Sequence, residues 1–424
     1  MLTIKYIREQ KEEVIKKLAV KNFNATQIIN EIIEIDDFRK NYQLNLDNSN
    51  SELNKLSKEI GNLFKNGQVE EANSAKLKTA DLKEEIKNLN SKLADFEQHL
   101  QKLLVQLPNT PHESVTPGKG EEDNVIIKNS GEMPKLSNNK LPHWELAKKY
   151  DIIDFELGNK ITGAGFPVYK GKGAKLQRAL INFFLDEAQK AGYREVQPPI
   201  MINEASGFGT GQLPDKEGQM YYAEKDNFYL IPTAEVPITN IYRDVIVNAS
   251  DFPIKNTAYT PCFRREAGSY GKDVRGLNRL HQFDKVEIVN IQHPDKSYET
   301  LDEMVKYVES LLIKLELPYR ILRLCGGDLS FTSALTYDFE VYSAAQEKWL
   351  EVSSVSNFES YQANRLKLRF KEEGEKKAKL AHTLNGSALA LPRIVAALLE
   401  NNQTTEGINI PKILSSYTGF NIID

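Results

Sequence analysis

The sequence predicts an α+β protein in two parts, a long N-terminal antiparallel coiled-coil hairpin and a second domain built on an antiparallel β-sheet flanked by helices. Two observations support this prediction. The first third of the 424 residues repeats apolar side chains at steps of three and four, and the rest alternates helical stretches with short strand-like runs. A segment rich in Pro, Gly, Asn and Ser separates them. We therefore expect an arm at 1–107, a linker at 108–125 and the second domain at 126–424.

The arm is predicted from two heptad series, over residues 28–63 and 72–107. Their apolar residues occupy the a and d positions of a coiled coil. Because only the short polar break at Asn66-Gly67 separates the series, the two helices must pair antiparallel. At about 1.5 Å per residue each helix would extend on the order of 60 Å. A coiled coil for dimerisation or spacing is the alternative, because the acidic and basic side chains of the arm balance each other.

The second domain is predicted from its mixture of periods. Residues 174–192, AKLQRALINFFLDEAQKAG, are typical of a helix, whereas YLIP, DKVEIVNI, YRILRLC and YDFEVYS are typical of strands. No GxGxxG follows a strand and no GxxxxGK[ST] occurs, which argues against Rossmann and P-loop nucleotide sites.

Composition narrows the function classes. The chain has 40% hydrophobic and 27% charged residues, and no apolar run approaches the roughly 20 residues of a membrane span. The N-terminus lacks the apolar core of a secretory signal, so we expect a cytoplasmic protein without a membrane partner. Only Cys262 and Cys325 occur, without a CxxC motif, which favours two reduced thiols over a zinc site. The net charge of −4 is not the overall positive charge that is typical of proteins that bind nucleic acid.

The densest group of chemically active side chains lies at residues 260–291. Arg264, Arg265 and Glu266 precede a loop with Gly268, Gly271, Lys272 and Arg275, and Phe283 lies in the return strand. Guanidinium groups bind phosphate oxygens, glycines let a loop close over a ligand, and an aromatic face can receive adenine. This segment therefore fits a nucleoside triphosphate, with a solvated charged hairpin as the alternative.

The same segment resembles motif two of class II aminoacyl-tRNA synthetases, and FRREAG followed by RGLNRLHQFDKVE is similar to its seryl-specific form. Other blocks agree in order and spacing: LPHWELAKKYDIIDFE, GYREVQPPIMI resembling motif one, GTGQLP, IPTAEVPITN, and HTLNGSALALPR resembling motif three. The resemblance implies a class II catalytic domain. It also implies an ATP-dependent ligase that converts L-serine to seryl-adenylate, releases pyrophosphate and transfers serine to the 3′ end of tRNA(Ser), leaving tRNA(Sec) open as a second acceptor.

The resemblance also assigns roles around ATP. Arg264 would contact the α-phosphate and the serine carboxylate, and Arg393 would lie near the γ-phosphate, which makes these two the expected catalytic residues. Glu266 would hold the adenine amino group while Phe283 stacks on the ring. Glu351 would bind the Mg²⁺ that accompanies ATP, although a structural carboxylate is an equal alternative there. The remaining expected ATP-binding residues are Arg265, Arg275, Val352, Ser353 and Ser354.

Recognition of serine is the harder physical problem, because its side chain offers a single hydroxyl. A pocket that hydrogen-bonds this hydroxyl rejects alanine, since its own polar groups would otherwise stay unpaired. The resemblance implies Thr233 and Glu235 at the ammonium end. It implies Glu287, Thr383 and Ser387 at the hydroxyl end. Ala234, Arg264 and Asn385 complete the expected set, and ordinary capping or turn roles are the alternative for the threonines and the serine.

Two partners follow from the resemblance. The arm would bind a tRNA with a long variable arm, and the helix and strand of motif one would form a homodimer interface. The alternatives are a class II synthetase for another amino acid, such as threonine or proline, a ligase that charges a carrier or metabolite, and a coiled-coil protein with a degenerate catalytic domain. The arm argues against the first two, and Arg264 with Arg393 against the third.

Overall fold

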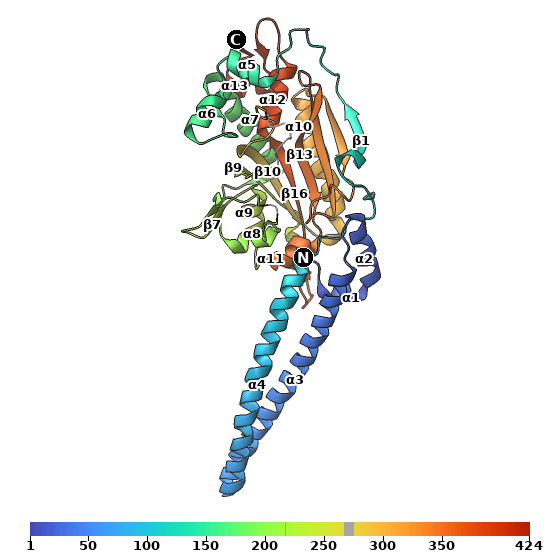
Figure 1. The fold of residues 1–424 in the computed structure, drawn as a ribbon, viewed down its shortest axis with the longest axis vertical. Helices are drawn as coiled ribbons and strands as arrows, with labels where there is room; N and C mark the ends of the chain where they lie inside the picture. The colour runs from blue at the N-terminus through green and yellow to red at the C-terminus, as the bar shows by residue number, and fades with distance from the viewer. Residues whose placement is uncertain (217, 267–274) are drawn as a thin grey trace. The chain divides into compact units, whose positions relative to one another are not determined.

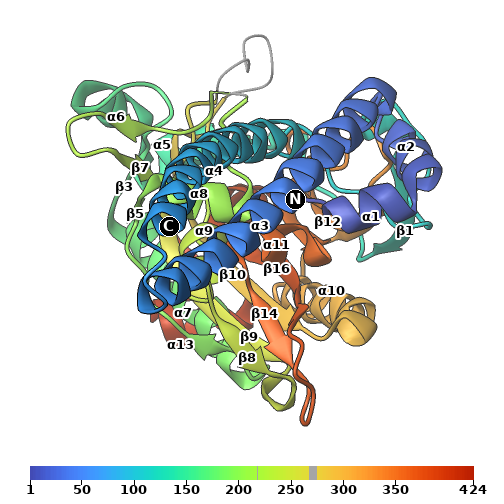
Figure 2. The ribbon, with the colours of Figure 1, turned by 90° about the horizontal axis from the view of Figure 1, so that it is seen from below.

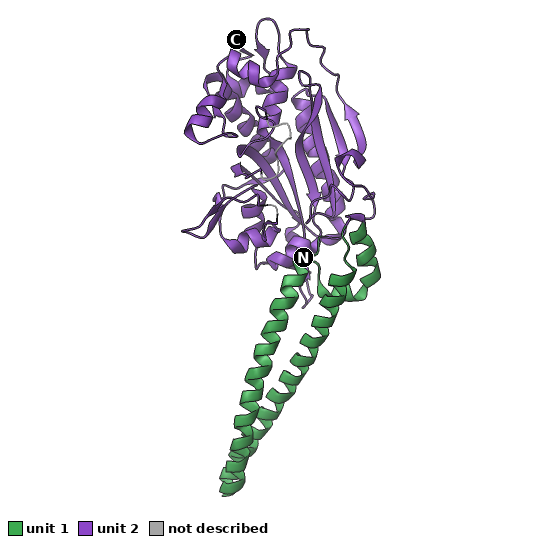
Figure 3. Ribbon diagram, viewed as in Figure 1, with its two compact units in different colours: residues 1–19, 23–108 green, residues 20–22, 109–424 purple. Residues whose placement is uncertain are grey.

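The computed structural model describes residues 1–216, 218–266 and 275–424. Gly268, Gly271 and Lys272, expected in the loop over the phosphates, lie outside these residues. The chain divides into two compact units, which are coloured separately in Figure 3. Unit 1 comprises residues 1–19 and 23–108, and unit 2 comprises residues 20–22 and 109–424.

Unit 1 is helical. Its two long helices, α3 (Thr26–Lys65) and α4 (Val69–Leu104), run side by side in both views (Figure 1, Figure 2). They are joined at the expected polar break, where Gly67 has a φ of 76° that favours glycine. The predicted antiparallel hairpin is confirmed. α4 ends three residues before the predicted Leu107, and the turn that follows is closed by a hydrogen bond from Leu107 N–H to the carbonyl of Leu104.

The heptad seam is confirmed along the hairpin. On α3, Leu46 is buried and Leu53 is half-buried, while their neighbours along the helix are exposed; on α4 the buried seam residues include Leu93 and Leu100. This is the burial that a and d positions require when two helices pack against each other.

The sequence analysis missed two short helices before the hairpin, α1 (Ile4–Glu9) and α2 (Lys11–Val20). Because α1 packs on α3, the α3 residues buried there include Asp36. Asp36 forms ion pairs with Arg8 at 3.0 Å, Arg39 at 2.8 Å and Lys40 at 3.0 Å. Three cations therefore compensate a fully buried carboxylate, as a buried charge requires.

Unit 2 is built on an eight-stranded sheet in the order β1-β11-β12-β13-β16-β10-β9-β4, in which only β4 and β9 pair parallel. The prediction of a largely antiparallel sheet is confirmed. The strands are β1 (Val125–Ser130), β4 (Arg194–Glu195), β9 (Ile254–Phe263), β10 (Gln282–Gln292), β11 (Tyr319–Arg323), β12 (Leu335–Ser343), β13 (Lys348–Asn357) and β16 (His382–Ala390).

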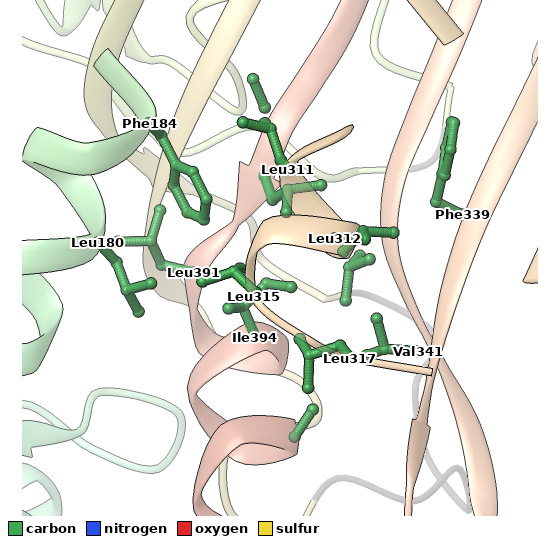
Figure 4. Close-up of a cluster of buried hydrophobic side chains, with 14 of the residues drawn as sticks. Leu180, Phe184, Leu311, Leu312, Leu315, Leu317, Phe339, Val341, Leu391 and Ile394 are labelled. Atoms are coloured by element: carbon green, nitrogen blue, oxygen red, sulfur yellow. The ribbon is translucent and has the colours of Figure 1, made fainter. Parts of the chain in front are cut away.

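Three long helices pack on this sheet, α7 (Gly171–Lys190), α10 (Ser297–Lys314) and α12 (Leu391–Asn401). Their apolar faces and one face of the sheet share a single hydrophobic core. Figure 4 shows part of this core, in which Leu180 and Phe184 of α7, Leu311 and Leu312 of α10, Leu391 and Ile394 of α12, and Phe339 and Val341 of β12 lie together. This packing leaves the opposite face of the central strands for other contacts.

Smaller elements surround the sheet. The helices are α5 (His143–Lys149), α6 (Phe155–Ile161), α8 (Glu204–Thr210), α9 (Glu235–Asn240), α11 (Ser360–Leu366) and α13 (Ser415–Thr418). The strands are β2 (Ile153–Asp154), β3 (Val168–Tyr169), β5 (Met201–Ile202), β6 (Tyr222–Ala223), β7 (Phe228–Leu230), β8 (Ile246–Asn248), β14 (Arg369–Lys371), β15 (Lys379–Leu380), β17 (Ile408–Asn409) and β18 (Ile422–Ile423). Among the described helices, none has both the length and the apolar character needed to cross a membrane.

Candidate active site

The pleat of two neighbouring strands separates the core from the candidate site. On β10, Val286 and Ile288 enter the hydrophobic core. Because side chains alternate along a strand, the residues between and beside them face the other way. The register pairs Glu287 with Ser387 on β16. The polar residues brought to this face from the two strands are Lys285, Glu287, Thr383, Asn385 and Ser387.

Glu287 is the centre of the first polar cluster, and its side chain is only 1% exposed. Its carboxylate accepts a hydrogen bond from Asn385 Nδ2 at 3.0 Å and one from Ser387 Oγ at 3.4 Å. Lys285 Nζ lies 2.5 Å from Glu287 Oε2 and donates to Thr233 Oγ1 at 2.8 Å. Four predicted residues therefore meet here, together with Lys285, which the sequence analysis did not single out.

Glu235, at the start of α9, is a second buried carboxylate on the same face. Burial, followed by the negative charge of Glu287, raises the pKa of Glu235 to about 7, against the opposing effects of Gln362, Lys285 and Arg264. A carboxylate that is costly to ionise by itself gains strongly when a cation is placed beside it. The site is therefore suited to a ligand that carries a positive charge.

Gln362, from α11, connects Glu235 with Thr383 on β16. Its Nε2 donates to Glu235 Oε1 at 2.6 Å, and its Oε1 accepts from Thr383 Oγ1 at 2.7 Å. A glutamine amide that donates and accepts in this way has a fixed orientation. Gln362 thus orients both predicted residues, although it carries no motif signal of its own.

Arg264 follows β9 and lies beside this pocket. Its guanidinium is centred 5.2 Å from the ring of Phe283, and its Nε lies 3.4 Å from the carbonyl of Pro232. The structure therefore brings together the expected phosphate-binding arginine and the expected adenine-stacking ring.

The other residues of this hairpin have different contacts. Glu266 accepts a hydrogen bond from Arg279 Nη1 at 2.8 Å. Arg265 is exposed, with its guanidinium 6.0 Å from the ring of Tyr221. Arg275 lies over Trp144 at 4.7 Å. Arg265 and Arg275 thus have their described ring contacts outside the Glu235 and Glu287 cluster.

Arg393, at the start of α12, connects the motif three helix with β13. Its Nη1 donates to the carbonyl of Glu351 at 2.7 Å and lies 3.7 Å from the carboxylate of that residue, while its Nε donates to the carbonyl of Asn278 at 3.1 Å. The side chain of Glu351 is 50% exposed, and Ser354 Oγ lies 3.5 Å from it. This edge of the site therefore combines a guanidinium with an accessible carboxylate.

Three of the predicted residues do not offer their side chains to a ligand. Val352 packs in the main hydrophobic core, and Ala234 packs in a small apolar cluster with Ile238, Ala258 and Val289. Ser353 is buried and donates to the carbonyl of Ser387 at 2.6 Å. These three residues can therefore contribute to the site through their backbone atoms or by supporting neighbouring residues.

Asp338 is a half-buried residue with a buried carboxylate oxygen, which the sequence analysis did not identify. It pairs with Ser354 across β12 and β13, and its Oδ1 lacks a hydrogen-bond partner within the described part of the chain. Burial, followed by the charge of Glu351, raises its pKa well above the usual range. The alternation of YDFEVYS was a usable signal, because Phe339 and Val341 enter the core and place Asp338 on the opposite face.

Comparisons with known proteins agree with this architecture. Residues 1–111 match the seryl-tRNA synthetase N-terminal domain, and residues 220–402 match the tRNA synthetase class II core domain (G, H, P, S and T). A serine–tRNA ligase from Salinibacter ruber is 51% identical over 421 residues, which cover 99% of this chain and 98% of that protein. The chain belongs to the seryl-tRNA synthetase family.

Solved structures support the same membership. The seryl-tRNA synthetase of Pyrococcus horikoshii, complexed with ATP, is 33% identical with a TM-score of 0.93, over 100% of this chain and 99% of that one. The cytoplasmic serine–tRNA ligase of Naegleria fowleri, in complex with AMP, is 27% identical with a TM-score of 0.87, again over 100% and 99%. The predicted fold class and family are therefore confirmed, whereas the roles of individual side chains stay predictions.

Proposed function

We propose that this chain is a serine–tRNA ligase, which activates L-serine with ATP and transfers it to the 3′ end of tRNA(Ser). The observation that carries the proposal is the pair of buried carboxylates, Glu235 and Glu287, placed beside Arg264 on the open face of the sheet. An amino acid presents an ammonium, a carboxylate and a side chain, and these three groups match the two carboxylates and the guanidinium in chemistry.

Serine recognition follows from how this pocket is hydrogen-bonded. Glu235 receives the ammonium, because its burial makes an added positive charge favourable. Glu287 accepts the serine hydroxyl, with Asn385 and Ser387 fixing the carboxylate from the other side. Alanine would bring no donor to the acceptor capacity of Glu287 that these bonds leave over, and a buried site that hydrogen-bonds a substrate hydroxyl rejects an analogue lacking it.

The first step is displacement at phosphorus. A serine carboxylate oxygen attacks the α-phosphorus of ATP, the bond from that phosphorus to the bridging oxygen breaks, and pyrophosphate leaves. Arg264 lies 5.2 Å from the Phe283 ring and its charge acts on Glu235, so its guanidinium can hold the serine carboxylate and the α-phosphate together. Reducing the repulsion between these two anions and fixing their geometry supplies the catalysis. In the second step a terminal hydroxyl of the tRNA attacks the acyl carbon and AMP leaves.

Mg²⁺ is proposed to accompany ATP at β12 and β13. Asp338 has a carboxylate oxygen without a hydrogen-bond partner within the described part of the chain, and burial, followed by the charge of the accessible Glu351 carboxylate, raises its pKa. Two oxygen ligands that repel each other fit a hard divalent cation, although the described residues contain no cluster of three or more metal-ligating side chains. Bound Mg²⁺ would neutralise phosphate charge, while Asp338, Glu351 and Ser354 hold it in place.

The proposal includes the tRNA arm and a dimer. We assign α3 and α4 to tRNA binding, since they form the N-terminal domain that this family shares. For the homodimer, a surface groove of about 530 Å³ runs along α7, the helix before the motif one strand, and combines Leu185 and Tyr417 with Arg178. Light scattering of the purified chain should give a dimeric mass, and a monomer at micromolar concentration would refute the interface. We place the enzyme in the cytoplasm.

ATP–pyrophosphate exchange with each of the twenty amino acids tests the proposed specificity. Serine should stand alone, since alanine lacks the hydroxyl that the pocket binds and threonine must be excluded by the size of its additional methyl group. Exchange driven by threonine or proline would instead establish a class II synthetase for another amino acid. If serine is activated but tRNA(Ser) is not charged, a carrier or metabolite ligase becomes the better assignment. Charging of tRNA(Sec) is measured in the same assay.

A further inference from the structure

A buried polar network joins α5 and α12 to the segment 275–278, which follows the motif two loop. At its centre are His143 and Glu400, whose side chains are both 0% exposed. His143 Nδ1 lies 2.7 Å from Glu400 Oε1, and the same oxygen accepts the backbone N–H of His143 at 2.9 Å. Two residues that are joined by one side-chain bond and one backbone bond, with both side chains closed off from water, form a rigid support.

The contacts of His143 determine which ring nitrogen carries the proton. The backbone N–H of Leu277 points at His143 Nε2 at 2.8 Å. A backbone N–H can only donate, so Nε2 is the acceptor and carries no hydrogen. The proton is therefore on Nδ1, which donates it to Glu400. The imidazole thus connects the backbone of Leu277 to a carboxylate on α12.

Glu400 is fully satisfied as an acceptor. Besides its two bonds from His143, it accepts from Ser343 Oγ and from Gln346 Nε2, the latter at 2.8 Å, and both donors lie at the turn between β12 and β13. Burial raises the pKa of Glu400, but the hydrogen bonds from His143 and Ser343 outweigh this effect and hold the pKa below its usual range. Glu400 is therefore the anionic anchor of the network.

The network holds the backbone beside two arginines. A Cβ at Gly276 would come within 2.2 Å of His143 Nε2, so the chain passes directly against the imidazole. Next to it, the guanidinium of Arg275 lies 4.7 Å from the ring centre of Trp144, the neighbour of His143 on α5. On the other side, the carbonyl of Asn278 accepts from Arg393 Nε at 3.1 Å.

Gln346 ties Asn278 into the same network. Asn278 Nδ2 donates to Gln346 Oε1 at 2.9 Å, and Gln346 Nε2 donates to Ser343 Oγ at 2.9 Å as well as to Glu400. Each position from 275 to 278 is thus set by α5 or by the turn between β12 and β13. None of the described contacts of this network reaches Glu235 or Glu287.

We propose that His143, acting with Glu400, is a positioning residue for ATP: it fixes the segment 275–278 and through it the guanidinium groups of Arg275 and Arg393. This inference rests on the proposed function, since it takes ATP as the substrate and Arg275 and Arg393 as the ATP-binding residues that the family resemblance implies. Its distinctive consequence is selectivity between substrates. Loss of the network raises the KM for ATP and leaves the KM for serine unchanged.

Two isosteric variants of the full-length enzyme separate the two bonds of the ring. His143→Gln places an amide oxygen near the position of Nε2 and keeps an acceptor for Leu277. His143→Asn places its amide near Nδ1 and loses that acceptor. In ATP–pyrophosphate exchange, His143→Asn should raise the KM for ATP about tenfold and leave the KM for serine within twofold of wild type. His143→Gln should restore the KM for ATP to within about threefold.

The matched control is Asn401→Ala, one residue beyond Glu400 on α12. Asn401 binds the same region through the carbonyl of Tyr342 and the N–H of Ala344, but has no contact with residues 275–278 among its described bonds. This variant should lower the Tm and leave both KM values unchanged. If His143→Asn behaves like this control, or raises both KM values equally, the positioning role is wrong.

Two further outcomes are decisive. If His143→Asn does not fold, Gln346→Met is tested instead, because Gln346 lies at the margin of the network. It should raise the KM for ATP about threefold, and an unchanged value would overturn the inference. Failure of the proposed function is recognised separately, because wild-type enzyme would then show no serine-dependent exchange.

Discussion

Replacing Glu235 by glutamine should stabilise the protein at alkaline pH while damaging serine activation. The carboxyl pKa is raised from 4.5 to about 7 in the folded state. A group with a raised folded pKa favours folding when protonated, so its contribution is retained below pH 4.5 and is lost as the pH rises toward 7. At about 1.4 kcal/mol per pKa unit, the full cost of ionising Glu235 in the folded protein is about 3 kcal/mol.

Glutamine keeps the shape of Glu235 and its acceptor for Gln362 but never ionises. The free energy of unfolding can be measured by denaturant titration for both proteins at pH 5 and at pH 8. The advantage of Glu235→Gln over wild type should be about 2 kcal/mol larger at pH 8 than at pH 5. The control is Glu224→Gln, which makes the same change at an exposed carboxylate in the turn between β6 and β7.

The same substitution removes the counter-charge of the serine ammonium. A hydrogen bond to a charged group is worth about 1.5–3 kcal/mol, so the KM for serine should rise on the order of ten- to a hundredfold in pyrophosphate exchange. The cost assigned to ionising Glu235 would be refuted if the variant were less stable than wild type at pH 8. It would also be refuted if the free energies of unfolding of variant and wild type differed by the same amount at both pH values. An unchanged KM for serine would refute its role in binding.

Four other tests give sharp outcomes. Because protonated Glu235 cannot pair with an ammonium, the KM for serine of the wild type should rise as the pH falls below about 7, and a flat profile from pH 6 to 8 contradicts this. Arg264→Ala should abolish serine-dependent pyrophosphate exchange, and near-normal exchange removes Arg264 from the reaction. Deleting residues 30–100 should spare exchange but eliminate tRNA charging, so retained charging would sink the assignment of the arm. Asp338→Asn should raise the Mg²⁺ concentration for half-maximal exchange several-fold, and an unchanged requirement argues that the orphaned oxygen does not serve the metal.

The fold was largely predictable, because its signals are periodic and local. The step of three and four predicted the seam around Leu46 and Leu93, and the alternation in DKVEIVNI placed Val286 and Ile288 on the opposite face from Glu287. Helices α1 and α2 were missed because they are short, and α1 draws its stability from packing on α3 rather than from a long pattern.

Site residues could be predicted only where they lie within a recognisable sequence motif. Lys285 and Gln362 hold Glu287 and Glu235 in place, yet a lysine within a strand and a glutamine within a short helix give no local signal. Their function arises from strand register and from contacts across 127 positions of sequence separation, such as that between Gln362 and Glu235. Asp338 was missed for a related reason, since only the pairing of β12 with β13 shows that its carboxylate is buried.

The uneven burial of the hairpin seam implies a gradient of local stability along the arm. Where α1 packs on α3, Ile29 and Ile32 are completely buried, whereas Leu56, Ile60 and Leu63 toward the turn are only half-buried. Amide hydrogens should therefore exchange fastest near Gly67 and progressively more slowly toward Ile29, because opening the end of the hairpin exposes little apolar surface. The end nearest Gly67 is thus the part of the hairpin whose conformation costs least to change.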